Sequence, residues 1–469
     1  MRNAHVRYMC FPSVACTGVE TEVVIFPRDT SRVFRSEWEY SLGIVGMWDD
    51  EVDYMVKDPL NHPYEIRNGC LVFRHVFDRE QEYSIRFFKN GEPETRISMY
   101  AVDQDLHKLR PLKGDFHTHT YYSDGQDGVA MTASDYREEG FDFVTVTDHN
   151  RMFTSTLIQE MCDEMHTDLC VIRGEEVHTP GSALHIVHAG GKESVCSRYI
   201  KDGETYENEI RALEKRYDHV PEIYRTRMAK ARWACDKIHE AGGLAIFAHP
   251  FWSPNRYNIS GDFQNLLFDE RMFDAFELIG GCGEVNNNLH LAQWQDQQMK
   301  GNVLPAVGSS DSHNHDFESA VFARAFTIVF ARENTPEAIL EAVKNGWCVA
   351  GEIPGEMDKG VRFYGGSLRL VMFAHFLYKN YFNETWKLCV GEGVLMRRYA
   401  QGENVQDVLA ALKDSVPGFY RRYYGIDPAP VLPPDRIAFL DKCLRQQREI
   451  GPITKGSKIV IYGQNQRRE

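Results

Sequence analysis

Between residues 112 and 352, short apolar segments alternate with longer segments that have a helical pattern. The helical stretch 225–241 ends at Gly242-Gly243 and leads directly into the apolar segment LAIFAH, and the stretch 335–346 also ends at a glycine. Glycine is common just past the end of a helix, because it enters the left-handed backbone conformation at little cost. A repeated strand–helix order predicts an α/β fold on a largely parallel sheet, either open or closed into a barrel.

A β-rich segment precedes this region. Over residues 1–108, four short runs are rich in Val, Ile, Phe and Tyr, as expected of strands: TEVVIF (21–26), CLVFRHVF (70–77), YSIRFF (83–88) and ISMYAV (97–102). Asn90-Gly91, between the last two runs, is a typical hairpin turn. We therefore predict a small β-sandwich-like module over residues 1–108.

Two further segments depart from the strand–helix order. Residues 191–224 are charged and have a helical pattern, so we interpret them as an insertion within the 112–352 region. Residues 361–469 predict a mainly helical C-terminal extension. The apolar stretch near 368–382 is expected to pack against the α/β region and not to form an exposed interface.

Composition narrows the classes of function. The 469-residue chain has 53 Lys and Arg against 68 Asp and Glu, a formal net charge of -15. This balance argues against nucleic acid as a partner, because binding a phosphate backbone requires clustered cations. The 11 cysteines include no C-x-x-C pair, which is typical of reduced thiols in a cytoplasmic protein. No apolar run reaches the roughly 20 residues of a membrane span, so we expect a cytoplasmic protein without a membrane partner. The sequence leaves the oligomeric state open.

Histidine, aspartate and glutamate recur where predicted strands end. In GDFHTHTYYSDG, His117 and His119 are two residues apart, so on an extended strand both side chains point to the same face. An H-x-H pair alone is a weak signal, because two surface histidines give the same pattern. Five later strand ends also carry such residues, in the segments TVTDHN, VIRGEEVH, ALHIVHAGG, LAIFAHP and AVGSSDSH. Functional residues of α/β barrels gather at the carboxyl ends of the strands, so together these segments predict a metal cluster.

Taken together, the motifs FHTHTYYSDG, TDHN, GEEVH, LHIV, AHP and GSSDSH resemble those of the PHP (polymerase and histidinol phosphatase) family, over about residues 112–352. The resemblance implies a distorted (β/α)7 TIM-like barrel for this region and a site for two or three divalent metal ions. It also implies nine metal ligands: His117, His119, Asp124, His149, Glu176, His185, His249, Asp311 and His313. Mixed imidazole and carboxylate ligation suits Mn, Zn or Fe better than Ca or Mg.

At two positions in the set of nine metal ligands, two nearby residues are alternatives for one ligand. Glu175 and Glu176 point to opposite faces of a strand, and the family pattern Gly-x-Glu selects Glu176. His185 competes with His188, and the family pattern of a histidine followed by aliphatic residues favours His185. His178 shares the strand face of Glu176 and is expected to contact the substrate or to support a ligand.

Two carboxylates are candidates for orienting the imidazoles. Asp115 has the same strand parity as His117 and His119, so it could hydrogen-bond to one of their rings. Asp148, directly before His149, is a second candidate. An equally ordinary role for both is that of a solvated carboxylate at the end of a strand.

The resemblance implies a phosphoesterase that hydrolyses a phosphate ester of a small metabolite or nucleotide through a metal-bound hydroxide. Glu176, Asp311 and His313 are the predicted catalytic residues, and the two oxygens of Glu176 suit it to bridge two metals. Arg151 and Arg256 follow ligand-bearing segments, and we predict that they bind the substrate phosphate.

Three other functions fit parts of the pattern. A nuclease or proofreading-type PHP module would act on nucleic acid, but the sequence has neither a polymerase region nor a basic balance. A non-catalytic metal-binding protein would not need the full set of ligand types that is present. A hydrolase of C–N or C–O bonds is the third alternative, because related barrels use similar ligands.

Overall fold

The N-terminal part of the chain folds as two four-stranded sheets that face each other across one apolar core. The computed structural model describes residues 7–28, 32–48, 61–253, 256–315, 321–354 and 360–450. One sheet has the order β1 (Tyr8–Phe11), β3 (Glu20–Pro27), β6 (Cys70–Val76), β5 (Glu65–Arg67), and the other β2 (Val14–Cys16), β8 (Glu92–Val102), β7 (Gln81–Lys89), β4 (Tyr40–Gly46). Ile25 of the first sheet and Phe87 of the second lie in the shared core. Asn90 and Gly91, with φ values of 51° and 80°, form the turn between β7 and β8.

The region that carries the strand-end motifs holds two sheets, each partly parallel and partly antiparallel. The first has the order β11 (Cys170–Ile172), β10 (Phe143–Val146), β9 (Arg110–Thr118), β17 (Ala325–Ala331), β18 (Cys348–Glu352), β19 (Arg362–Tyr364). The second has the order β12 (Gly174–His178), β13 (His185–Gly190), β14 (Gly243–Phe247), β15 (Ala275–Ile279), β16 (Ala306–Gly308). The mixed α/β class agrees with the prediction. Among the described residues, however, the paired strands do not close into a ring, so the predicted (β/α)7 barrel is not confirmed.

A short connection explains why β12 and β13 are antiparallel. Only residues 179–184 separate the two strands, whereas a parallel pair needs a crossover of about a dozen residues or more. The two sheets approach each other at two isolated bridges, Thr118 with Ser312 and His149 with Glu176. Both bridges involve the segments that carry the predicted ligands, so these segments meet in one place.

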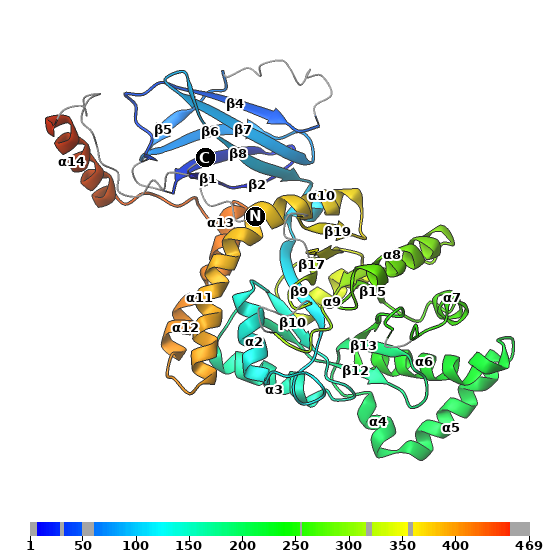
Figure 1. Ribbon diagram of the computed structural model, residues 1–469. Coiled ribbons are helices and arrows are strands. Elements are labelled where there is room, and N and C mark those ends of the chain that lie inside the picture. The colour runs from blue at the N-terminus through cyan, green and yellow to red at the C-terminus, as the bar shows by residue number, and fades with distance from the viewer. Residues whose placement is uncertain are drawn as a thin grey trace, which may run out of the picture.

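Helices flank the two sheets (Figure 1). They are α1 (Gln104–His107), α2 (Val129–Glu138), α3 (Phe153–Met165), α4 (Cys196–Lys201), α5 (Gly203–Glu214), α6 (Glu222–Ala241), α7 (Gly261–Asp269), α8 (Glu284–Met299) and α9 (Pro336–Lys344). The ends of two of them follow the sequence signals, because α6 stops at Gly242 with φ of 86°, and the side chain of Thr335 caps α9. The charged insertion forms α4, α5 and a short 3-10 turn, and it lies at the end of the molecule away from the sandwich.

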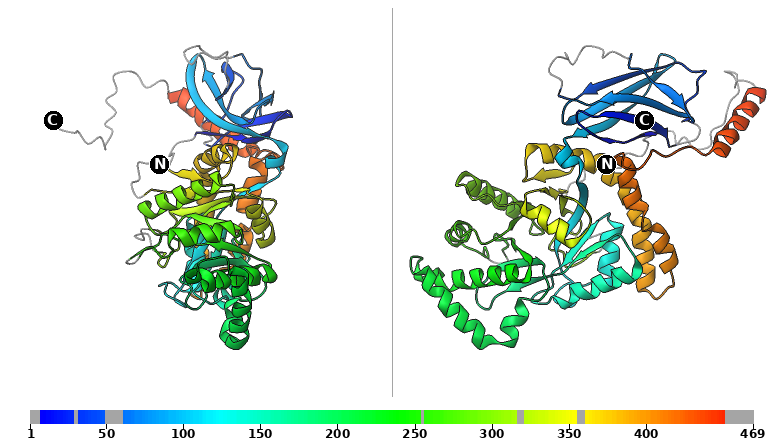
Figure 2. Two further views of the ribbon diagram at one scale, coloured as in Figure 1. Left: turned by 90° about the vertical axis from the view of Figure 1, so that its right-hand side faces the viewer. Right: turned by 180° about the vertical axis from the view of Figure 1, so that it is seen from behind.

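The C-terminal extension joins the sandwich to the α/β region (Figure 2). It comprises α10 (Leu368–Leu377), a π-helical turn (Tyr378–Phe382), α11 (Asn383–Ala400), α12 (Gln406–Leu412), α13 (Ser415–Tyr423) and α14 (Pro434–Ile450). The ring of Phe373 in α10 lies 5.0 Å from Tyr100 of β8 and 5.8 Å from Phe330 of β17. The apolar stretch is therefore core, and it binds the two parts of the molecule together.

Parts of the predicted domains lie outside the described residues, namely 1–6, 29–31 and 49–60 of the β-module, 254–255 and 316–320 of the α/β region, and 451–469 of the helical extension. None of the helices in the described ranges combines the length and the apolar composition that crossing a bilayer requires.

Candidate metal centre

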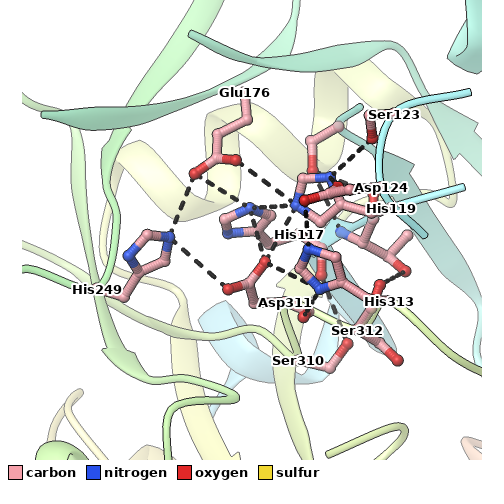
Figure 3. Close-up of polar contacts among 12 residues, drawn as sticks. His117, His119, Ser123, Asp124, Glu176, His249, Ser310, Asp311, Ser312 and His313 are labelled. Carbon is pink, nitrogen blue, oxygen red and sulfur yellow. Dashed lines mark hydrogen bonds and ion pairs between the residues drawn. The ribbon is translucent and has the colours of Figure 1, made fainter. Parts of the chain in front are cut away.

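Imidazoles and carboxylates from both sheets meet where the sheets approach each other (Figure 3). All nine predicted ligands lie in this cluster, each with a nitrogen–oxygen contact of 3.4 Å or less to another member: His117, His119, Asp124, His149, Glu176, His185, His249, Asp311 and His313. Metal binding by these residues stays a prediction, but the folded chain brings the whole set together.

Glu176 lies at the centre of the cluster. Its side chain is 1% exposed, and its Oε1 lies 2.9 Å from His185 Nδ1 and 3.2 Å from His249 Nε2. Its Oε2 lies 2.7 Å from His149 Nδ1. Burial alone would raise the pKa of this carboxyl, yet the surrounding imidazoles hold the pKa well below its ordinary value. A buried carboxylate whose two oxygens face different imidazoles has the geometry of a bridge between metals.

Asp311 is a second carboxylate within the cluster. Its Oδ1 lies 3.1 Å from His119 Nε2 and 3.3 Å from His117 Nε2. Asp311 and His249 have φ values of 49° and 22°, in the left-handed region that L side chains rarely adopt. This conformation costs about 1–3 kcal/mol per residue and persists only where the surrounding structure fixes it. At both positions the strained residue follows a strand and contributes its side chain to the cluster.

One end of the cluster reaches solvent. Asp124 Oδ2 lies 3.1 Å from His149 Nε2 and 3.4 Å from His313 Nε2. The side chains of Asp124 and His313 are 52% and 38% exposed, whereas those of His117 and His119 are fully buried. The cluster is therefore open to solution on the side of Asp124 and His313, while His117 and His119 stay shielded from water.

Several buried atoms of the cluster lack a hydrogen bond of acceptable geometry to any described residue. They are His149 Nδ1, Glu176 Oε2, His178 Nε2 and His185 Nδ1. Buried polar atoms are nearly always hydrogen-bonded, so a set of unsatisfied atoms around one point needs a further partner. Two ligand atoms at about 2.1 Å from one metal, at octahedral to tetrahedral angles, stand about 3.0–3.4 Å apart. The separations of 2.7–3.6 Å between Glu176 and its imidazoles fit this spacing closely enough to accept metals.

Overlapping sets of these side chains could each hold an ion. Within the described ranges, five groups of three or four His, Asp or Glu residues have ligand atoms within 4.8 Å of one another. Glu176 belongs to three of these groups, and a fourth combines His119, Asp124, His149 and His313. The donors are imidazole nitrogens and carboxylate oxygens, which suit Mn, Zn or Fe.

Glu277 orients His117, and the sequence analysis missed it. Its Oε2 lies 2.9 Å from His117 Nδ1, and both side chains are fully buried. A carboxylate behind an imidazole fixes the tautomer of the ring, which here leaves Nε2 to face Asp311. The available signal was a single charged residue inside the otherwise apolar strand β15, AFELI.

The two carboxylates that were predicted to orient imidazoles behave differently. Asp148 supports His119 through Ser123, whose hydroxyl lies 2.6 Å from Asp148 Oδ1 and 3.4 Å from His119 Nδ1. Asp115 instead accepts hydrogen bonds from the backbone N–H groups of His117 and Ser310, so its predicted contact with an imidazole is wrong. Burial raises the pKa of Asp115 to about 6, and its bonds tie β9 to the segment after β16.

The competing neighbours separate onto the two faces of one hairpin. His185 contacts Glu176, whereas His188 Nδ1 lies 3.3 Å from Glu175 Oε1 on the opposite face. Glu175 also accepts hydrogen bonds from the backbone N–H groups that follow Ser194. His185 begins β13 and does not end a strand, so the expectation that every candidate follows a strand is wrong at this position. The antiparallel pairing of β12 with β13 nevertheless places His185 beside His178.

The three predicted substrate contacts have different surroundings. His178 Nε2 lies 3.2 Å from Glu176 Oε2, and its ring stacks on His185 at 3.7 Å, so His178 is itself a candidate ligand. Arg151 is exposed, and its guanidinium donates a hydrogen bond to the carbonyl of Tyr122, in the loop that carries Asp124. Arg256 is exposed and has no hydrogen bond or ion pair to another described residue. Phosphate binding by the two arginines stays a prediction.

Comparison with known proteins gives partial structural likenesses. No protein-family profile matches the chain, and no curated protein matches it. Among solved structures, it is similar to a two-domain protein from Bacteroides vulgatus that contains a predicted PHP-like metal-dependent phosphoesterase, with 21% identity and a TM-score of 0.37. That match covers 52% of this chain and 65% of the Bacteroides chain.

Two further solved structures resemble a smaller part of the chain. A provisionally named metal-dependent phosphoesterase from Bifidobacterium adolescentis has 15% identity and a TM-score of 0.33, over 44% of this chain and 90% of that one. An amidohydrolase from Chromobacterium violaceum, with bound sulfate and no metal, has 17% identity and a TM-score of 0.32, over 44% and 89%.

Proposed function

We propose that this chain is a metal-dependent hydrolase of the PHP type that cleaves phosphate esters of small metabolites or nucleotides. The observation that carries the proposal is the position of Glu176, a fully enclosed carboxylate whose oxygens face imidazoles on both sides. The unsatisfied nitrogen and oxygen atoms around it support the binding of two or three divalent metals, in agreement with the motifs along the sequence.

The residues of the cluster divide into holding and orienting groups. Glu176 and Asp311 would each join separate imidazoles, and Glu277 and Asp148 fix the rings of His117 and His119. When bound, the metals would polarise a phosphate oxygen and lower the pKa of a coordinated water. The backbone carbonyl of Asp311 lies 2.9 Å from His313 Nδ1, which places the proton there and leaves Nε2 toward the solvent-exposed side.

The shape of the centre supports a small substrate. The phosphate group would enter beside Asp124 and His313, where the cluster is exposed, and Arg151 lies next to the loop of Asp124. An acidic chain of net charge -15 does not favour a polymeric phosphate backbone, so we propose a single phosphorylated molecule as substrate.

A substrate panel tests the proposal on the full-length chain supplied with Mn, Zn or Fe. The panel contains p-nitrophenyl phosphate, nucleoside monophosphates and bisphosphates, simple amides and single-stranded DNA. We expect metal-dependent hydrolysis of phosphate esters that is lost in Glu176→Gln and kept in His219→Ala, which removes an exposed histidine of the insertion. Hydrolysis of amides alone, or release of nucleotides from DNA alone, would replace the proposed reaction with another class.

A further inference from the structure

A cavity of about 390 Å³ lies between the sandwich and the C-terminal helices. The outer face of β8 packs on α10 through Tyr100 and Phe373, and the cavity opens further along the same interface. Its walls include Arg96 and Ser98 of β8 on one side, and the π-helical turn with the start of α11 on the other. Sites for small molecules have volumes of about 300–1,000 Å³, so this cavity has room for one.

The walls of the cavity are cationic. Among the described residues, they carry Arg28, Arg96 and Lys379 against a single carboxylate, Glu384. Glu384 is already shared, because it lies 2.9 Å from Arg28 and 2.8 Å from Lys387. Arg96 Nη2 donates a hydrogen bond to Met47 Sδ at 3.6 Å. Neither Arg96 nor Lys379 has an ion pair with any described carboxylate. Among the described residues, these two positive charges therefore have no paired carboxylate at the cavity.

Neutral hydrogen-bonding groups accompany these cations. The hydroxyl of Ser98 and the side-chain amide of Asn383 line the cavity, and neither has a hydrogen-bond partner among the described side chains and backbone. Lys379 lies in the π-helical turn Tyr378–Phe382. Turns of this kind are rare and occur often at functional sites, because they displace side chains from the regular helical positions.

The excess of positive charge at the cavity contrasts with the negative net charge of the whole protein. A chain of net charge -15 repels anions at long range, and its surface cations have many carboxylates available as partners. We propose that the cavity binds a small molecule with a phosphate or carboxylate group, which Arg96 and Lys379 hold from opposite walls. This site is separate from the metal centre, because the residues that line it belong to the sandwich and the C-terminal helices.

Calorimetric titration with inorganic phosphate at constant ionic strength tests the site on the full-length chain. Because phosphate also suits the metal centre, the titration is made in His117→Ala/His119→Ala as well as in the wild type. We expect saturable binding in both, weakened at least about tenfold in Arg96→Gln/Lys379→Gln, since charge-assisted contacts dominate small anion sites. The matched control is Lys201→Ala/Lys413→Ala, which removes two exposed cations elsewhere and should bind phosphate as the wild type does.

A second variant distinguishes phosphate binding inside the cavity from general attraction of phosphate to surface cations. Ser98→Phe fills the cavity from the β8 wall and leaves Arg96 and Lys379 in place, so it should abolish the same binding. If His117→Ala/His119→Ala does not fold, the titration is made on the chain with its metal centre intact. Phosphate then binds in two classes, one at the metal centre and one at the cavity, and Ser98→Phe should remove only the second class. The proposal is overturned if phosphate binding outside the metal centre is absent, or if it is unchanged in either Arg96→Gln/Lys379→Gln or Ser98→Phe.

Discussion

Replacing Glu277 by glutamine tests how strongly a carboxylate behind the cluster controls metal binding. Glutamine keeps the shape of the side chain and removes its charge. Its carbonyl can still accept a hydrogen bond from His117 Nδ1, which now lies 2.9 Å from the carboxylate. The amide NH₂ would then occupy the place of Glu277 Oε1, which has no hydrogen-bond partner among the described residues. The variant therefore weakens the orientation of His117 and buries an unsatisfied donor.

We expect Glu277→Gln to lower metal affinity 10- to 100-fold, which corresponds to about 1.4–2.7 kcal/mol. Competition against a chelating indicator measures this affinity, and thermal melting of the metal-free protein verifies that the fold is kept. The control is Glu352→Gln, a buried carboxylate of β18 that lies 2.9 Å from the hydroxyl of Tyr364 and not in the cluster. Metal affinity equal to that of the wild type in Glu277→Gln would refute the positioning role.

Three further predictions concern the hairpin and the core. His185→Ala should lower the metal content, whereas His188→Ala, on the face of Glu175, should leave it unchanged, and equal losses in elemental analysis would contradict this assignment. Burial lowers the pKa of Lys113 from 10.5 to about 8, so the unfolded chain binds more protons at Lys113 between these pH values. The contribution of Lys113 to the stability of the fold therefore rises with pH across that window. Lys113→Met should accordingly be more stable than the wild type at pH 7, by up to roughly 3 kcal/mol, and urea unfolding should show this difference shrinking toward pH 10. Glu392→Ala leaves the buried guanidinium of Arg137 without its carboxylate partner, which lies 2.6 Å away. This variant should lower the free energy of unfolding in urea by about 3–5 kcal/mol. A loss below about 1 kcal/mol would contradict this prediction.

Local patterns predicted the parts of the fold that depend on neighbouring residues. The apolar runs of the sandwich coincide with β3, β6, β7 and β8, apart from one residue past the end of β6, and glycine marks the end of α6. The arrangement of the strands was harder to predict from the sequence, because it depends on pairings between distant segments. The short connection between β12 and β13 was a sign of a hairpin, but the strand–helix order elsewhere favoured parallel strands and a barrel.

The candidate ligands could be predicted because each one stands in a short motif beside an apolar segment. Their supporting residues could not be predicted in the same way. Glu277 lies 160 positions from His117, and only the folded chain places it behind that ring. Asp115 has the strand parity of the ligands, yet it accepts hydrogen bonds from the backbone N–H groups of His117 and Ser310 and not from an imidazole. Parity along one strand does not report which distant segment lies opposite.

Metal content per chain tests the central claim most directly. Elemental analysis of the purified full-length protein, after loading with Mn, Zn or Fe and removal of free ions, should give two or three metals per chain. The same measurement on His117→Ala/His119→Ala should give fewer, while His219→Ala should match the wild type. Less than one metal per chain in the wild type, or an unchanged content in the double variant, would contradict the account of Glu176 and its imidazoles as a metal centre.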